Sequence, residues 1–318
     1  MKKLFILSSF LLLCLAARTQ SIDDVQAYYK ADGTRFLALL NDKSIWWYMD
    51  GDSWKKVATT GLPGNTAIKS LDVYIKNSGL IADTRLIVVM DDNSMWWYKE
   101  GEKWEQVPSQ GLPEGKPIKI FESYVKTVMG ISESRYAVIL DDNSIYWYSP
   151  GDNWAKVPPK GLPSGFNVKF FKSYVKYGMM GSTEARYVVI LDDNSIWWYA
   201  DGNDWEKLES KGLPAGQDIT QFDTYLKMKV AGMPEARLVT VLADQSIWWL
   251  AVGAKDWEKI DVKGLPSGYK IKSFKVYQKY AGIPQTRLLA LLDDNTMWWY
   301  DDKQGWTAVP TTGLLTKK

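Results

Sequence analysis

The chain has 318 residues, with 39 basic and 37 acidic side chains, a single cysteine and no histidine. This composition excludes Ser-His-Asp and Cys-His nucleophiles, imidazole bases, and zinc sites built from histidine and cysteine. The near balance of charge also gives no basic surface for nucleic acid or anionic lipid. We therefore expect no cofactor and no nucleic-acid partner.

The first twenty residues have the layout of an export signal. Met1-Lys2-Lys3 is a short positive start, and the segment 4–17 is almost wholly apolar but too short to span a bilayer. Polar residues follow it. The pattern predicts a signal peptide over residues 1–20, cleaved near residues 16–20. A lipoprotein signal at Cys14 is the alternative.

The remaining 298 residues, 21–318, are predicted to form one domain. They keep 36 basic and 37 acidic side chains and have neither cysteine nor histidine, so disulfides cannot stabilise them. A chain of this size buries a sufficient apolar core without such bonds. No further apolar run is long enough for a transmembrane helix, and together with the signal this predicts a secreted or periplasmic location.

One unit of about 50 residues recurs six times along the domain. Its clearest marker is Asp91-Asp92-Asn93-Ser94-Met95-Trp96-Trp97-Tyr98, which returns at 141–148, 192–199 and 293–300 and, in weaker form, at 41–48 and 243–250. An arginine precedes every copy: Arg35, Arg85, Arg135, Arg186, Arg237 and Arg287. A later tryptophan follows every copy: Trp54, Trp104, Trp154, Trp205, Trp257 and Trp306.

Each unit contains four strand-like pieces, as the second copy illustrates. The segment 85–90 is rich in β-branched residues and apolar on both faces, as in a strand that is covered on both sides. A tight Asp-Asn turn over 91–94 leads into a second strand at 95–98. A third strand is expected at 104–107 and a fourth at 118–124. Helical spacing is found nowhere after residue 20.

Four short strands cannot bury two apolar faces alone, and radial stacking in a closed ring solves this problem. We therefore predict an all-β fold, a six-bladed β-propeller with four antiparallel strands per blade. The segment 22–28 aligns with the strand expected at 271–279, so it either opens the first blade or completes the last one. A sheet solenoid is the rival fold, but it needs dedicated end caps.

The paired tryptophans have a structural and a functional interpretation. Because both faces of a blade pack on neighbouring blades, we expect the second member of each pair to be buried in the core. The residues concerned are Trp47, Trp97, Trp147, Trp198, Trp249 and Trp299. The alternative is a platform on which sugar rings stack.

The polar residues of a unit fall at two opposite ends of the propeller. Arg85 and Asp92 are seven residues apart, which is about 20 Å along a strand. At the Asp92 end the acidic residue is expected to cap its own turn. Calcium is the weaker alternative there, and we predict no metal site.

The arginine end is the candidate ligand face. It also carries six Tyr-x-Lys pairs, at 28/30, 74/76, 124/126, 174/176, 225/227 and 277/279. Planar donors beside aromatic rings suit ligands rich in hydroxyls or carboxylates. The predicted ligand-binding residues are therefore the six arginines and the six later tryptophans. The alternative is that each arginine braces its blade by pairing with a carbonyl or an acidic neighbour.

The layout resembles the tectonin and tachylectin type of propeller lectin. The features that carry the resemblance are Trp104 to Val107, a Gly111-Leu112 link, Ile118 to Phe121, and the hairpin Asp91 to Trp96. Length and blade number also resemble the fungal fucose-binding lectins, whose sites use an arginine, a glutamate and a tryptophan. Arg85 and Trp104 match two of these, while Met95-Trp96-Trp97 supplies no glutamate.

Three functions follow as hypotheses. The first is an exported, multivalent lectin whose partner is a glycan or a cell-surface polysaccharide. The second is a scaffold that binds a protein partner. The third is a carboxylate-dependent glycosidase, which needs two acidic residues in one pocket. Near-identical units favour repeated binding sites over one catalytic centre, so we expect no enzyme.

Overall fold

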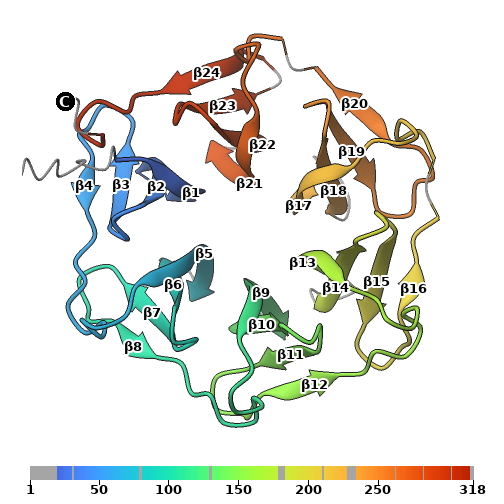
Figure 1. Cartoon of the computed structure of the whole chain (residues 1–318). Helices are drawn as coiled ribbons and strands as arrows, with labels where there is room; N and C mark the ends of the chain where they lie inside the picture. The colour runs from blue at the N-terminus through green and yellow to red at the C-terminus, as the bar shows by residue number, and fades with distance from the viewer. Residues whose placement is uncertain are drawn as a thin grey trace, which may run out of the picture.

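The computed structural model describes residues 20–315, except 31, 79–80, 129–130, 178–182, 210, 228–233, 262, 282 and 302. The predicted signal peptide lies outside the described residues, apart from Gln20. Six four-stranded antiparallel sheets surround one axis (Figure 1), which confirms the six-bladed propeller. In the part of the chain that is described, no helix has the length and apolar character needed to cross a membrane.

The strands of each blade run outward from the axis in chain order. The innermost strands are β1 (Ile22–Lys30), β5 (Ile68–Ser78), β9 (Ile118–Val128), β13 (Val168–Tyr177), β17 (Ile219–Lys227) and β21 (Ile271–Ala281). The second strands are β2 (Gly33–Leu40), β6 (Ile81–Met90), β10 (Ile131–Leu140), β14 (Thr183–Leu191), β18 (Glu235–Leu242) and β22 (Ile283–Leu292).

The outer half of each blade is shorter. The third strands are β3 (Ile45–Met49), β7 (Met95–Lys99), β11 (Ile145–Tyr148), β15 (Ile196–Ala200), β19 (Ile247–Ala251) and β23 (Met297–Asp301). The fourth strands are β4 (Lys55–Lys56), β8 (Glu105–Gln106), β12 (Ala155–Val157), β16 (Glu206–Lys207), β20 (Glu258–Ile260) and β24 (Gly305–Val309).

The apolar core lies between the blades. The second strands are buried on both faces, as their continuous β-branched composition predicts; in β6 every residue from Leu86 to Met90 is buried. Each of six clusters joins two neighbouring blades. In the one between blades one and two, for example, Leu37 and Ile45 pack with Val88 and Trp104. The stability of a blade therefore depends on its neighbours, as in other repeat folds.

The ring closes with the same contacts that join the other blades. Strand β1 pairs with β2, so it opens the first blade, and the last blade is complete without it. The indole of Trp54 donates to the Pro310 carbonyl at 2.8 Å, and the Ile22 amide donates to Asn295 at 3.0 Å. Leu314 is buried in the cluster shared by the last and first blades.

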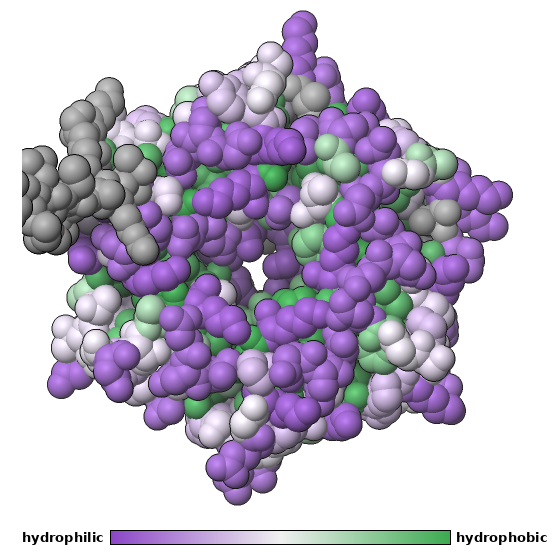
Figure 2. Space-filling model, viewed as in Figure 1, coloured by the Kyte–Doolittle hydropathy of each residue, from purple (hydrophilic) through white to green (hydrophobic). Residues whose placement is uncertain are grey.

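Polar side chains of the innermost strands line the axis, where Figure 2 shows an open hole. Glu122 is buried and pairs with Lys172 of the next blade at 2.8 Å, and it also accepts from the Ser173 amide at 3.3 Å. Lys172 lies 3.6 Å from Asp223 as well, and the charge of Asp72 also acts on the Glu122 carboxyl. Burial raises the pKa of Glu122 to about 7.

Candidate functional site

The side chains of the Asp-Asn-Ser turns at one end of the propeller form hydrogen bonds that stabilise the fold. Asp92 accepts from the Ser94 amide at 2.9 Å and from its hydroxyl at 2.6 Å, which confirms that the acidic residue caps its own turn. Asn93 has a positive φ of 65°, and its side chain accepts from the Ile118 amide of the next blade at 2.9 Å. Among the described residues, no group of three or more metal-binding side chains gathers.

The six later tryptophans lie in the core. They are only 3–7% exposed. Trp104 stacks on Tyr98 at 5.0 Å and donates to the Ala58 carbonyl of the preceding blade at 2.8 Å. Trp154 and Trp205 make the same contact with Pro108 and Pro158. These tryptophans, which the sequence predicted as ligand residues, therefore join neighbouring blades and offer little surface to a ligand.

The second tryptophan of each pair packs against an inter-blade core cluster but keeps part of its surface exposed, so the expectation that it is buried in the core holds only in part. The blades diverge with distance from the axis (Figure 1), and the third strand lies where the neighbouring blade no longer covers it fully. An arginine of the same blade lies over each of these rings. The guanidinium-to-ring distances are 4.8 Å for Arg35–Trp47, 4.4 Å for Arg85–Trp97, 5.3 Å for Arg135–Trp147, 4.5 Å for Arg186–Trp198, 3.6 Å for Arg237–Trp249 and 4.8 Å for Arg287–Trp299.

A side chain close before each arginine fixes the guanidinium on its ring. Asp83 accepts from two nitrogens of Arg85 at 2.9 and 3.1 Å, and Glu184 does the same for Arg186 at 3.0 and 3.2 Å. The corresponding partners are Asp32 for Arg35, Glu133 for Arg135, Glu235 for Arg237 and Gln285 for Arg287. Each arginine thus pairs with a neighbouring side chain, as the bracing interpretation predicted. This pairing also holds the guanidinium in a fixed orientation beside an aromatic ring.

Four pockets formed by the described residues lie beside these arginines at blade junctions. Their volumes are about 210 Å³ between blades one and two, 80 Å³ between three and four, 560 Å³ between four and five, and 340 Å³ between six and one. Each contains the arginine, the second tryptophan and the Tyr-x-Lys tyrosine of one blade, facing the second and third strands of the next. The structure thus brings together the arginine and tyrosine that the sequence placed at this end.

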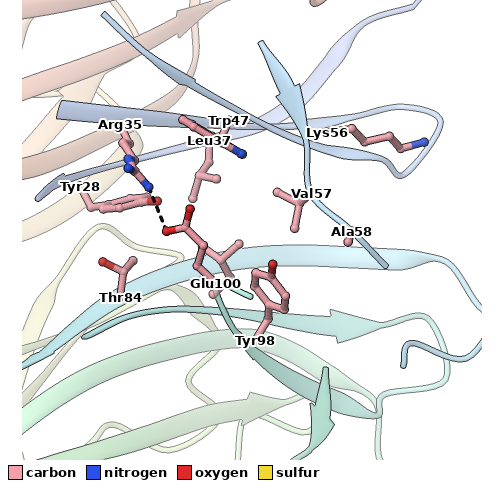
Figure 3. Close-up of a pocket in the computed structure, with 11 residues that line it drawn as sticks. Tyr28, Arg35, Leu37, Trp47, Lys56, Val57, Ala58, Thr84, Tyr98 and Glu100 are labelled. Atoms are coloured by element: carbon pink, nitrogen blue, oxygen red, sulfur yellow. Dashed lines mark hydrogen bonds and ion pairs between the residues drawn. The ribbon is translucent and has the colours of Figure 1, made fainter. Parts of the chain in front are cut away.

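The pocket between blades one and two shows the arrangement most fully (Figure 3). Arg35 and Trp47 come from blade one, and Thr84, Tyr98 and Glu100 come from blade two. Arg35 bonds to Glu100 across the junction at 3.1 Å. The hydroxyl of Thr84 is buried and has no hydrogen-bond partner among the described residues. A ligand hydroxyl in this pocket would satisfy it.

The protonation states in this pocket suit hydrogen bonding to a neutral polar ligand. A hydrogen bond from Lys30 lowers the pKa of Glu100, so its carboxylate is an acceptor at neutral pH. Burial raises the pKa of Tyr28 to about 12, so its hydroxyl keeps its proton. The pocket therefore offers a cationic donor, an anionic acceptor and three hydroxyl groups, those of Tyr28, Thr84 and Tyr98, around a tryptophan ring.

Two residues of these pockets lie outside the predicted ligand-binding set. One is the second tryptophan, which was expected in the core, with a sugar-stacking platform as the alternative. The hairpin register pairs Ile87 with Trp97, which sets Arg85, two residues earlier on the same face, diagonal to that ring. The other is the acidic residue that follows the third strand of the next blade, Glu100 in this pocket. It comes from another repeat, and no spacing within one unit indicates it.

No protein-family model and no curated protein matches the sequence. Solved structures of several lectins are similar in fold. The fucose-specific lectin of Aleuria aurantia, a six-bladed β-propeller, has a TM-score of 0.58 at 15% identity over 92% of this chain and 95% of the lectin. AofleA from Arthrobotrys oligospora has a TM-score of 0.61 at 11% identity, covering 91% and 86%. The BP39L lectin of Burkholderia pseudomallei has a TM-score of 0.52 at 16% identity, covering 92% and 83%.

These likenesses establish a shared fold. They confirm the resemblance to six-bladed fucose-binding lectins at the level of architecture. The tectonin and tachylectin resemblance, based on short motifs, stays a prediction.

Proposed function

We propose that the chain is a multivalent carbohydrate-binding protein whose inter-blade pockets each hold one sugar unit. The observation that carries the proposal is the arginine fixed over a partly exposed tryptophan ring in all six blades. The exposed part of such a ring packs against the apolar C–H face of a sugar, while the guanidinium donates to hydroxyls at its edge. The lectin neighbours, which have the same fold, support this function.

The six arginine–tryptophan pairs lie at the same end of the propeller, so sites built on them would act together. The second strands run in the same sense around the axis, so every arginine is at the opposite end from the Asp-Asn-Ser turns. A single sugar with a few hydrogen bonds and one stacked ring binds weakly. Six such sites on a dense glycan surface would raise avidity about 10²–10⁴-fold over a single site.

Binding fits the chemistry of the pocket better than glycoside hydrolysis does. A hydrolase needs one carboxylic acid with a raised pKa as its proton donor. The pKa of Glu100 is lowered instead, because Lys30 and Arg35 both bond to it. Two cations hold this carboxylate ionised, so it accepts hydrogen bonds and does not donate a proton.

Export is part of the same proposal. Strand β1 begins at Ile22, so cleavage near residues 16–20 would leave all strands of the propeller intact. The N-terminal sequence of the protein from its native host would test this. A mature chain that begins within or just after residues 16–20 supports export, and an intact Met1 refutes it.

The function is tested by replacing the arginines. Arg135→Ala alone should leave binding to immobilised polysaccharide mostly intact, while replacing all six should abolish it. A sixfold lysine variant is the matched control, because it keeps the charge but loses the planar fork of donors. Circular dichroism checks the fold of each variant. A folded sixfold alanine variant that binds as well as the parent would show that the arginines only brace the blades. If neither protein binds any glycan, the protein-scaffold function takes precedence.

A further inference from the structure

The pocket between blades four and five differs from its equivalents in size. Its volume is about 560 Å³, against 340, 210 and 80 Å³ for the other three pockets described above. A cavity of that size is in the range that holds a ligand of several chemical groups.

Two replacements in blade five distinguish it from the walls of the other three pockets. Leu250 stands where the other five blades have a tyrosine, which in each of them packs against the later tryptophan. Val252 stands where the walls of the other three pockets have an acidic residue, which is Glu100 in blade two. Ala236 stands in the place of Thr84, but blade four has Ala185 there as well, so this change alone does not enlarge a pocket. Blade five has thus lost an aromatic ring and a carboxylate beside this pocket.

The opposite wall keeps the polar arrangement of the other pockets. Arg186 lies 4.5 Å from the Trp198 ring, fixed by Glu184, and Tyr174 stands beside it. The blade-five wall is mainly apolar, with Pro234, Ala236, Leu238 and Val252; its charged residue, Glu235, is paired with Arg237 of the same blade at 2.7 Å. The cavity is therefore two-sided, with hydrogen-bonding groups around a ring on blade four and an apolar surface on blade five.

We propose that this pocket binds a sugar that carries an apolar substituent, such as an acyl or aryl group, and that the other pockets take the unsubstituted sugar. The sugar ring lies on Trp198 and Arg186, as in the general site, and its substituent packs against Leu238 and Val252. This inference rests on the proposed carbohydrate binding and adds the ligand class of one site. An apolar group buried in such a pocket improves affinity by about 10-fold or more.

The test compares methyl and phenyl glycosides of the same sugar, over a panel of common sugars, by isothermal titration calorimetry. The phenyl glycoside should show one site per chain that is about 10-fold tighter than the sites for its methyl partner. An acetylated sugar paired with its free form distinguishes an acyl from an aryl preference. Leu250→Tyr with Val252→Glu restores the residues found in blade two and should remove this tight site alone.

The reverse substitution is the matched control. Tyr98→Leu with Glu100→Val makes the blade-two wall like that of blade five, and should add a second tight site for the phenyl glycoside. Melting curves check that both double variants fold, and either one alone suffices for the test. Methyl glycosides that bind with no tight phenyl site, or a tight site that survives the blade-five variant, overturn this inference and leave carbohydrate binding standing. A parent that binds no glycoside of either kind overturns both.

Discussion

Trp154 and Trp147 of blade three are close in sequence and should contribute very differently to stability. Trp154 is 4% exposed, stacks on Tyr148 at 5.2 Å, and donates to the Pro108 carbonyl at 2.8 Å. Trp147 is half-buried beneath Arg135, with 5.3 Å between the guanidinium and the ring. Replacing each by alanine separates a core role from a surface role within one blade.

The expected magnitudes follow from burial. Truncating a fully buried aromatic side chain costs about 3–5 kcal/mol, and losing the indole also leaves a buried carbonyl without its donor. Trp147→Ala removes less buried area and one cation–π contact, so it should cost less, about 1–2 kcal/mol. For a chain of this size, 1 kcal/mol shifts the melting temperature by about 2 °C. The two variants should therefore melt about 4–6 °C apart, with Trp154→Ala the lower.

Thermal unfolding followed by circular dichroism measures the difference, with both variants at one protein concentration. Trp154→Phe isolates the hydrogen bond, because it keeps most of the ring and removes the N–H group, and it should fall between the parent and Trp154→Ala. If Trp147→Ala melts at or below Trp154→Ala, the division between core and pocket tryptophans is incorrect.

Three further substitutions test the contacts that hold the ring. Gly161→Ala should destabilise by about 2–4 kcal/mol, because its Cβ would lie 2.2 Å from the Trp205 carbonyl oxygen at a φ of +101°. Gly151→Ala, with a φ of +96° and open space around it, is the control and should cost only about 1–2 kcal/mol; equal melting points would contradict the clash. Asn93→Ala should lower the free energy of unfolding by about 1–3 kcal/mol, because it removes the hydrogen bond to the next blade and places alanine at a φ of 65°. Asn93→Gly removes the same hydrogen bond without the backbone strain, so in urea unfolding it should be more stable than Asn93→Ala and less stable than the parent. Because burial raises the pKa of Glu122 from 4.5 to about 7, its protonated form stabilises the fold at low pH and this contribution is lost as pH rises through 7. Glu122→Gln should flatten that decline in urea unfolding between about pH 5 and 8, and an unchanged pH profile would show that another group causes it.

The architecture could be predicted because the repeat number, the strand-like segments and the turn residues all indicated the same fold. Six copies of one unit, each with four strand-like segments, leave few alternatives to a closed ring. The phase of the blades could not be predicted, since a segment such as 22–28 aligns equally well as a first or a last strand. The structure resolves this through pairing: β1 bonds to β2 of its own blade.

The sequence prediction placed the ligand face at the arginine end and chose the later tryptophan as the ring beside each arginine, whereas the structure sets the second tryptophan of the pair there. Trp104 and Trp97 are both apolar residues in strands, and composition alone does not say which of them a neighbouring blade covers. Which of the two tryptophans is covered depends on how neighbouring blades are arranged in space. The indole N–H of Trp104 reaches the chain that links the preceding blade to its own, while Trp97 faces the widening gap beneath Arg85.

The contacts that hold the ring and the residues that shape the pockets vary to different degrees between blades. Asn93 and Trp104 bond to main-chain groups, and the main chain is the same in every blade, so their equivalents recur with few exceptions. In the described part of the chain, the residues of the pocket wall make no such hydrogen bond to the main chain of a neighbouring blade. Its acidic position holds Glu100 in blade two, a proline in blade three and Val252 in blade five, although the strands that carry it pair in the same register. The fold does not require these differences, so under the proposed carbohydrate binding they would make the pockets unequal in the ligands they accept. A propeller with six equal pockets would bind best to a polymer of one sugar, whereas unequal pockets favour a surface that displays several kinds of sugar together.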